Sequence, residues 1–173
     1  MALIVRPARA SDEDFLWEML HLTLFVPPGE DEFPDTLVRS EPKLSGFVEG
    51  FGSSDDDHGS IAEDGGRMIG AAWVRHVADG YGYVADDVPE LAIAVVPDRR
   101  GEGVGGALLA AVIAGIERVV PGLSLSCDDR NPARRLYERF GFEQVRFDEP
   151  HSVVMIRRFD HGELIPMAPM MLP

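Results

Sequence analysis

An apolar run followed by a glycine-rich loop constrains the fold of this chain more than any other feature. Residues 91–96 contain no polar side chain, which is typical of a strand buried on both faces. Four of the six residues from 101 to 106 are glycine. From 108 to 120, apolar residues recur every three or four positions, as on the buried face of a helix. The segment predicts a strand, a glycine-rich loop and a helix in that order.

The remaining pattern predicts a mixed α/β domain over residues 1–158, followed by a Met- and Pro-rich tail over residues 159–173. A helix between strands 91–96 and 123–127 implies that these two strands are parallel and joined by a right-handed crossover. The other expected elements are strands at 3–6, 60–63, 68–77, 145–147 and 152–156, and helices at 11–24, 36–51 (weaker, broken by Pro42) and 131–141.

The glycine-rich loop is suited to binding phosphate oxygens. Glycines let backbone N–H groups converge and let an anion approach closely, and the following helix adds the positive end of its dipole. A tight turn is the alternative, but a simple turn needs one glycine, not four. No Lys-Ser or Lys-Thr follows the glycines, which excludes the Walker pattern.

A dinucleotide-binding fingerprint is the competing phosphate motif. Gly101, Gly103 and Gly106 have its spacing, and Asp128 follows the next strand. Residues 97–100, however, separate the strand from the glycines, where that turn should be immediate. Only about 45 residues remain after Asp128, too few to complete a doubly wound sheet. We therefore expect another kind of phosphate site.

The charge of the chain limits its partners. With 16 basic and 30 acidic residues among 173, the net charge is −14, which argues against nucleic acid and anionic membranes and leaves room for a cationic substrate. Residues 1–90 hold 19 acids and 6 bases (−13), and residues 91–173 hold 11 acids and 10 bases (−1). The single cysteine, Cys127, favours the cytoplasm. The apolar run 107–116 is shorter than the roughly 20 residues of a membrane span.

The loop and three other segments resemble one family. Arg100-Gly101-Glu102-Gly103-Val104-Gly105 is similar to the R/Q-x-x-G-x-G/A signature of the GNAT (GCN5-related) N-acetyltransferases. Residues 4–12 resemble the first strand and helix start of that family, residues 91–97 its fourth strand, and residues 131–142 its N-x-x-A-x-x-L-Y-x-x-x-G-F segment. The resemblance extends from about Leu3 to Arg158. It implies the GNAT fold, a twisted mixed sheet of about six to seven strands flanked by helices.

The resemblance also implies acetyl-CoA as cosubstrate, no metal, and a set of backbone contacts. In this family the strand before the loop splays from its neighbour and binds the pantetheine arm. The Ile93 N–H would face the thioester oxygen, where it would stabilise a developing oxyanion, and the Val95 backbone would face pantetheine. The residues implied to bind the phosphates, or CoA beyond them, are Arg100, Gly101, Gly103, Val104, Gly105, Gly106, Asn131 and Arg134.

Candidate acid and base residues complete the expected site. By resemblance, Tyr137 protonates the departing thiolate as general acid; its alternative role is core packing. Glu90, at the mouth of strand 91–96, is the candidate general base, although on a regular strand it shares a face with Ala92 and Ala94, away from the cofactor contacts. Other candidates for the base are Asp86, Asp87 and His76. Cys127 has no nearby histidine in the sequence, so a covalent route is not expected.

The sequence therefore predicts a cytoplasmic N-acetyltransferase that moves an acetyl group from acetyl-CoA to a primary amine by direct attack. A non-catalytic CoA-binding or protein-interaction domain of the same fold is the alternative. The methionines of the tail leave two possibilities open, packing on the domain or packing on a second copy in a homodimer.

Overall fold

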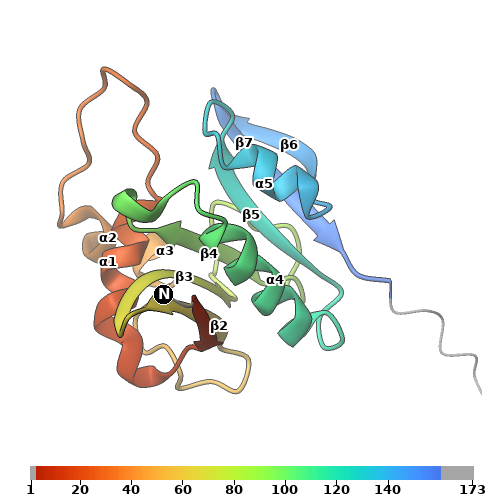
Figure 1. Ribbon diagram of the computed structural model, residues 1–173. Coiled ribbons are helices and arrows are strands. Elements are labelled where there is room, and N and C mark those ends of the chain that lie inside the picture. The colour runs from red at the N-terminus through yellow and green to blue at the C-terminus, as the bar shows by residue number, and fades with distance from the viewer. Residues whose placement is uncertain (1–2, 161–173) are drawn as a thin grey trace, which may run out of the picture.

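A seven-stranded sheet with the order β1-β2-β3-β4-β5-β7-β6 runs through the structure, a computed structural model that describes residues 3–160 (Figure 1). Of the neighbouring strands in this sheet, β4 and β5 are parallel and all the other pairs are antiparallel. The strands are β1 (Ile4–Pro7), β2 (His58–Asp64), β3 (Arg67–Arg75), β4 (Glu90–Val95), β5 (Gly122–Asp128), β6 (Glu143–Glu149) and β7 (Ser152–Arg158). The helices are α1 (Glu13–Thr23), α2 (Leu37–Ser40), α3 (Pro42–Ser45), α4 (Val104–Ile116) and α5 (Arg134–Arg139), with short 3-10 turns at Ala10–Asp12 and Pro97–Arg99.

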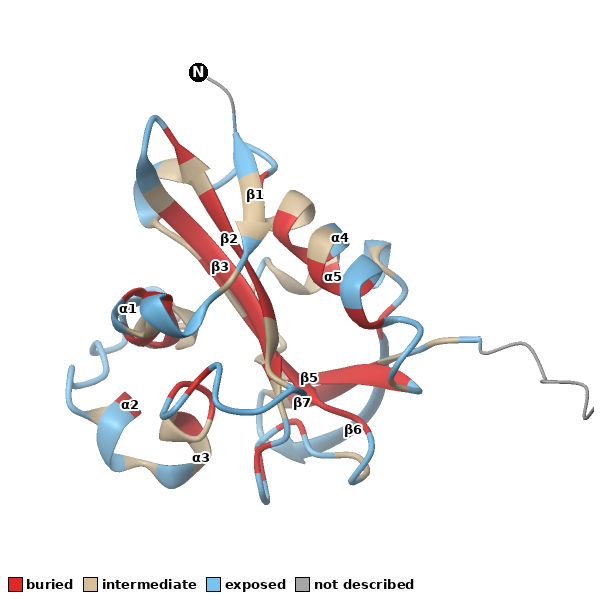
Figure 2. Ribbon diagram, turned by 90° about the horizontal axis from the view of Figure 1, so that it is seen from below, coloured by how far each residue is buried: buried red, intermediate tan, exposed pale blue. Residues whose placement is uncertain are grey.

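Helices cover both faces of the sheet, and each face has its own hydrophobic core. Figure 2 shows α1, α2 and α3 on one side of the sheet, with α4 and α5 on the other. Trp73 of β3 is fully buried on the α1 side, where its indole N–H donates to the Phe47 carbonyl oxygen at 2.8 Å. Leu91 and Tyr137 belong to the other core, beneath α4. The alternation of β4 therefore separates its side chains between two cores.

Strands β4 and β5 diverge after one rung. β4 pairs with β3 over six residues, from Glu90 opposite Arg75 to Val95 opposite Gly70. Its register with β5 consists of one pair, Glu90 opposite Ser124. A mixed sheet with a single parallel pair of strands is not a doubly wound dinucleotide fold, which needs a parallel sheet built from two halves. The mixed α/β fold predicted from the sequence is confirmed.

Two expected helices are shorter than the pattern suggested. The segment 36–51 contains only α2 and α3, because the chain is extended at Glu41 before Pro42. Asn131 does not begin a regular helix. Its Oδ1 accepts from the Ala133 N–H at 2.9 Å and caps a turn, and α5 begins at Arg134.

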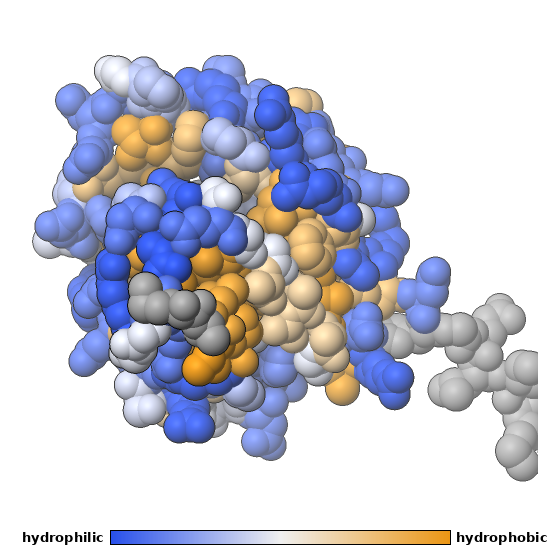
Figure 3. Space-filling view, viewed as in Figure 1, coloured by the Kyte–Doolittle hydropathy of each residue, from blue (hydrophilic) through white to orange (hydrophobic). Residues whose placement is uncertain are grey.

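The end of the described chain contacts the domain. The Phe159 N–H donates to the Pro121 carbonyl oxygen at 2.9 Å, and the Phe159 ring packs against the α4-side core. Beyond residue 160, the predicted tail lies outside the described residues. Figure 3 shows a hydrophobic area over β1 and α4, with hydrophilic residues around it. Within residues 3–160, no helix has the length and apolarity to span a membrane.

Candidate functional site

The base of the glycine-rich loop is fixed by ion pairs to the β2–β3 hairpin. Arg67 contacts Asp98 at 2.8 Å. Arg99 lies between the buried Asp64, at 2.9 Å, and Glu102, at 2.7 Å. The loop therefore leaves the sheet from an anchored turn, which favours one arrangement of the backbone that follows.

The four glycines of the loop have two different roles. Gly101 and Gly103 have positive φ angles of 79° and 84°, and a Cβ added to either would meet nothing within 4 Å. Both therefore border open space in a conformation that favours glycine. Gly105 and Gly106 lie in the first turn of α4, where a Cβ would approach Leu136 of α5 at 3.3 and 3.9 Å. Gly105 therefore lets α5 pack close to the start of α4, whereas a methyl at Gly106 would make only an ordinary contact.

The first turn of α4 presents backbone donors beside this open space. Gly103 precedes the helix, and Val104 begins it. The first N–H groups of any α-helix have no partner within the helix and form the positive end of its dipole. The residues expected to hold phosphate thus place their backbone donors at one helix terminus. Whether they bind CoA stays a prediction.

The backbone of β4 points alternately to its two neighbours. The Pro89 carbonyl oxygen accepts from the Ser124 N–H of β5 at 3.1 Å, whereas the Val96 N–H donates to Ile69 of β3 at 3.0 Å. Because backbone groups alternate along a strand, those of Ile93 and Val95 face the β5 side, where the strands have diverged. The polar backbone edge predicted to meet pantetheine is therefore directed into the gap in the sheet.

Arg100 connects the loop to that edge. Its Nε donates to the Val95 carbonyl oxygen at 3.0 Å. This contact brings an exposed guanidinium next to the strand end and the glycines. A cation in this position suits a phosphate ligand, although the sequence alone gave no reason to expect its bond to Val95.

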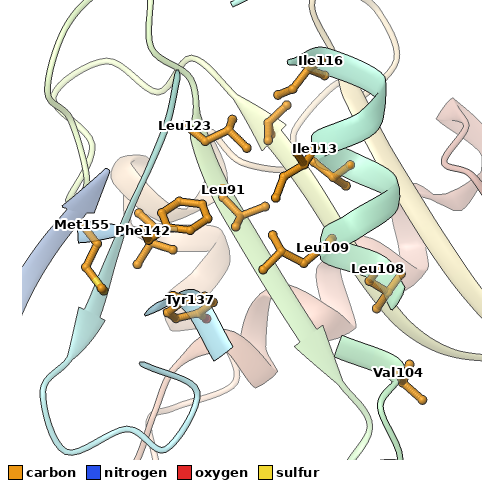
Figure 4. Close-up of a cluster of buried hydrophobic side chains, with 14 of the residues drawn as sticks. Leu91, Val104, Leu108, Leu109, Ile113, Ile116, Leu123, Tyr137, Phe142 and Met155 are labelled. Atoms are coloured by element: carbon orange, nitrogen blue, oxygen red, sulfur yellow. The ribbon is translucent and has the colours of Figure 1, made fainter. Parts of the chain in front are cut away.

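Tyr137 is a core residue that also borders the diverging strands. It is 7% exposed, and its ring meets that of Phe142 edge to face, with 6.1 Å between the centroids (Figure 4). Its hydroxyl has no hydrogen-bond partner among residues 3–160. Burial, with a smaller contribution from Cys127, raises the pKa of Tyr137 above its usual value. The group is thus held in its protonated form.

Cys127 lies on β5 near Tyr137 and is unsuited to nucleophilic attack. Its Sγ is half-buried, 4.0 Å from the Met155 sulfur. Burial raises the pKa of the Cys127 thiol to about 11, so little thiolate exists at neutral pH. This agrees with the expectation of a route without a covalent enzyme intermediate.

The other two residues expected to contact CoA, Arg134 and Asn131, already bond to protein groups. Arg134 donates from Nε to Glu138 at 3.0 Å and from a terminal nitrogen to Gln144 at 2.9 Å. The side-chain oxygen of Asn131 is bonded to Ala133. Both have structural roles in this conformation, and their contact with CoA stays a prediction.

Glu90 lies on the opposite face of β4 from Ile93 and Val95. The β3–β4 register is continuous, without a bulge, so Glu90 shares a face with Ala92 and Ala94, as its position in the strand predicts. The carboxylate is 3% exposed, and Oε2 accepts from the Gly82 N–H at 2.7 Å. Oε1 has no partner in the described part of the chain.

The environment of Glu90 sets its ionisation near neutral pH. Burial raises the pKa of the Glu90 carboxyl to about 7, against weaker opposing effects of the Gly82 N–H, Arg146 and Lys43. A carboxylate tuned to this range is suited to general base chemistry at physiological pH. The alternative bases are all exposed: His76, Asp86, which accepts from the Tyr83 hydroxyl at 2.8 Å, and Asp87.

The sequence pattern did not predict that two residues beside Glu90, Gly82 and Ser124, belong to the site. Gly82 lies in a polar link where one glycine gives no special signal, although the flanking Tyr81 and Tyr83 mark an unusual segment. Ser124 stands between Leu123 and Leu125 in the sequence. A lone hydroxyl in a buried strand needs a hydrogen-bond partner, and this requirement is the signal that could have indicated a site.

One cluster of ligand atoms within the described chain has metal-like spacing. Asp128, Asp129 and His151 bring three such atoms within 4.8 Å of one another. Arg130, however, contacts the Asp128 carboxylate at 2.7 Å, and His151 bonds Asp129 at 2.8 Å. The partners already present satisfy these groups, so we assign no metal to them.

A model of the acetyltransferase (GNAT) domain matches residues 55–144, which is more than half of the chain. The match includes β4, the glycine-rich loop, α4 and α5. The chain belongs to the GNAT acetyltransferase family. The family and the fold predicted from the sequence are confirmed.

Solved structures share the fold over nearly the whole chain. The PaiA N-acetyltransferase of Thermoplasma acidophilum, in complex with coenzyme A, aligns with a TM-score of 0.68 at 17% identity, covering 92% of this chain and all of that one. A phosphinothricin acetyltransferase from Sinorhizobium meliloti, in complex with acetyl-CoA, aligns with a TM-score of 0.64 at 19% identity, covering 94% and 91%. These likenesses show the fold.

One relative is similar at the level of sequence. Mycothiol acetyltransferase of Brachybacterium faecium is 36% identical over 78 residues, which is 44% of this chain and 23% of the relative. The chain thus spans about a quarter of the length of this curated relative. The acceptor of that enzyme is no guide to the acceptor here.

Proposed function

We propose that this chain transfers an acetyl group from acetyl-CoA to a primary amine by direct attack on the thioester. The divergence of β4 from β5 beside the glycine-rich loop is the observation that carries the proposal. It leaves the backbone groups of Ile93 and Val95 directed into a gap next to a helix N-terminus. Membership of the GNAT family supports acetyl-CoA as the acyl donor.

The residues of this chain fit such a donor. Gly101 and Gly103 leave open space in front of the first turn of α4, where backbone donors can hold the pyrophosphate. Arg100 adds a positive charge at the same place. The Ile93 N–H can stabilise negative charge on the thioester oxygen, and the Val95 backbone can bind the pantetheine arm.

Tyr137 supplies a proton donor on the donor side of the sheet. Its hydroxyl is protonated, nearly buried and without a protein partner among the described residues. A donor in this state can protonate a departing thiolate. Cys127 of β5 lies close enough to Tyr137 to affect its pKa, so β5 borders Tyr137.

Glu90 supplies a base on the other side of the sheet. Its carboxyl titrates near pH 7 and lies at the only rung that joins β4 to β5 in the described chain. Because both of its oxygens are covered, we propose that Glu90 receives the proton of the amine through an intermediary and not by direct contact.

The acceptor is proposed to be a cationic primary amine. The excess negative charge of the chain lies within residues 1–90, which include the helices on the Glu90 side of the sheet. Such a field concentrates cations near that face. We infer a cytoplasmic location from the single cysteine. Association into a homodimer stays a prediction.

Amine-dependent release of free CoA tests the proposed function. Thiol formation from acetyl-CoA would be measured against polyamines, aminoglycosides, amino acids and peptides with free N-termini. The proposal expects at least one class to release thiol in proportion to the protein. A melting temperature that rises with acetyl-CoA, without thiol release from any amine, would instead support the non-catalytic CoA-binding alternative.

A further inference from the structure

Two buried side-chain oxygens at one rung of the sheet have no hydrogen-bond partner in the described chain. They are Oε1 of Glu90, on a residue that is 3% exposed, and Oγ of Ser124, on a residue that is 0% exposed. Unpaired polar atoms in a protein interior are costly, so each requires an explanation. Their residues are register partners across the β4–β5 pair.

The two side chains lie on the same face of the sheet. Leu123 and Leu125 of β5 belong to the α4-side core, so the alternation of the strand directs Ser124 to the other face. Ala92, two residues from Glu90 on β4, belongs to the α1-side core. Paired strands lie about 4.8 Å apart, so Glu90 and Ser124 project side by side from one rung.

A loop closes over this rung and keeps both oxygens from bulk solvent. The Gly82 N–H binds Oε2 of Glu90. A Cβ on Gly82 would lie 2.7 Å from the Leu125 carbonyl carbon and 2.9 Å from the Ser126 nitrogen, so the loop backbone is pressed against β5. A Cβ on Gly80 would overlap Oε1 of Glu90, so the loop backbone at Gly80 also lies against this unpaired oxygen.

We propose that Ser124 is a positioning residue for Glu90, and that its hydroxyl and Oε1 of Glu90 bind one internal water molecule between them. Bridging waters commonly satisfy buried polar groups in this way. This inference rests on the proposed function for its catalytic meaning. The water would take a proton from the acceptor ammonium and give one to Oε1, so that an N–H bond breaks, an O–H bond forms on Glu90 and the neutral amine is free to attack.

Ser124 is suited to this role because a hydroxyl both donates and accepts. It can donate to the water when Glu90 is charged, and it stabilises the charged carboxylate through that water. Loss of the hydroxyl therefore raises the pKa of Glu90. The other charged groups near Glu90 stay in place: Lys43 of α3, Arg146 of β6, and Arg75 of β3, which is bound to Asp57 at 2.9 Å.

The pH profile of kcat/KM for Ser124→Ala tests the proposal. The acidic limb of this profile, where the rate rises as Glu90 loses its proton, should move to higher pH by about one pH unit. We also expect kcat near pH 7 to fall about tenfold. The acetyl-CoA melting shift should not change. Ser126→Ala is the matched control: Ser126 is two residues along β5, and its hydroxyl already lies 3.4 Å from that of Ser152. It should keep the wild-type profile.

Ser124→Thr and a direct titration sharpen the result. The threonine keeps the hydroxyl and should restore the wild-type limb. The Glu90 carboxyl carbon, followed by NMR, should titrate at higher pH in Ser124→Ala than in Ser126→Ala. This readout needs no turnover, so it tests the Ser124–Glu90 link even if no amine releases thiol, a result that would contradict only the proposed function.

A purely structural Ser124 predicts the opposite outcome. Removal of an unpaired buried hydroxyl would leave stability unchanged or raise it, and the pH profile and the Glu90 titration of Ser124→Ala would match those of the wild type. That result would overturn the proposal.

Discussion

The backbone N–H of Gly82 donates to Oε2 of Glu90 at 2.7 Å, so a loop residue caps the carboxylate that begins β4. The bond favours the charged form, and burial opposes it more strongly, which places the pKa of Glu90 at about 7. The covering loop thus does two things at once. It removes the carboxylate from water and returns part of the lost stabilisation.

Glu90→Gln should change the pH dependence of stability. The folded pKa of about 7 lies above the ordinary 4.5, so the folded state binds this proton more tightly than the unfolded state. Wild-type stability therefore falls as pH rises from 4.5 through 7, by up to about 3 kcal/mol. Glutamine has no such loss. In denaturant unfolding, the free energy of unfolding of Glu90→Gln relative to that of the wild type should be higher at pH 8 than at pH 5.

The control for this substitution is Glu143→Gln, at the exposed start of β6. Its difference from the wild type should be the same at both pH values. If Glu90→Gln also differs from the wild type by a constant amount, burial does not control the ionisation of Glu90.

Gly82→Ala should destabilise the fold. Its new methyl group would press on the backbone of Leu125 and Ser126, which cannot yield without displacing β5. We expect a loss of about 1–3 kcal/mol in the free energy of unfolding, the range of overpacked sites. In Gly106→Ala the methyl would make only ordinary contacts of 3.9 Å or more, and unfolding experiments should show no loss. Equal stability of the two variants would contradict the packing of this loop.

Gly103→Glu should abolish stabilisation by acetyl-CoA. The substitution places a side chain and a negative charge in the open space where we propose that the pyrophosphate binds. Gly66→Glu, in the β2–β3 turn, is the control, because Gly66 has a similar φ of 81° and the same open surroundings. Both variants should lose similar stability without ligand. Thermal shift with acetyl-CoA should separate them, and a normal shift for Gly103→Glu would exclude the loop as the phosphate site.

Tyr137→Phe should lower turnover without weakening acetyl-CoA binding. The hydroxyl has no hydrogen-bond partner among the described residues, so its removal should change stability little, whereas the departing thiolate would lose its proton donor. We expect kcat to fall about 10²-fold, within the usual range for such a group. Tyr83→Phe removes an exposed hydroxyl and should leave kcat unchanged. Unchanged turnover in Tyr137→Phe would leave Tyr137 as a core residue only.

The donor side of the site was largely readable in the sequence, because its chemistry is local. The strand, the loop and the helix are consecutive, and Gly101 and Gly103 are marked by a conformation that other residues rarely adopt. The alternation of β4 likewise predicted that Glu90 lies on the opposite face from Ile93 and Val95. What the pattern did not reveal was that Gly105 serves the packing of α5.

The sequence by itself determined the family, the order of elements, the phosphate-type loop and the uneven distribution of charge, since each depends on neighbouring residues or on composition. Only the tertiary structure decided the environment of Glu90. Its pKa, its Gly82 cap and its pairing with Ser124 arise where a loop, β4 and β5 meet. Burial depends on every segment packed around a group, so a carboxylate that looks like an ordinary strand-start charge becomes a base that titrates near neutral pH.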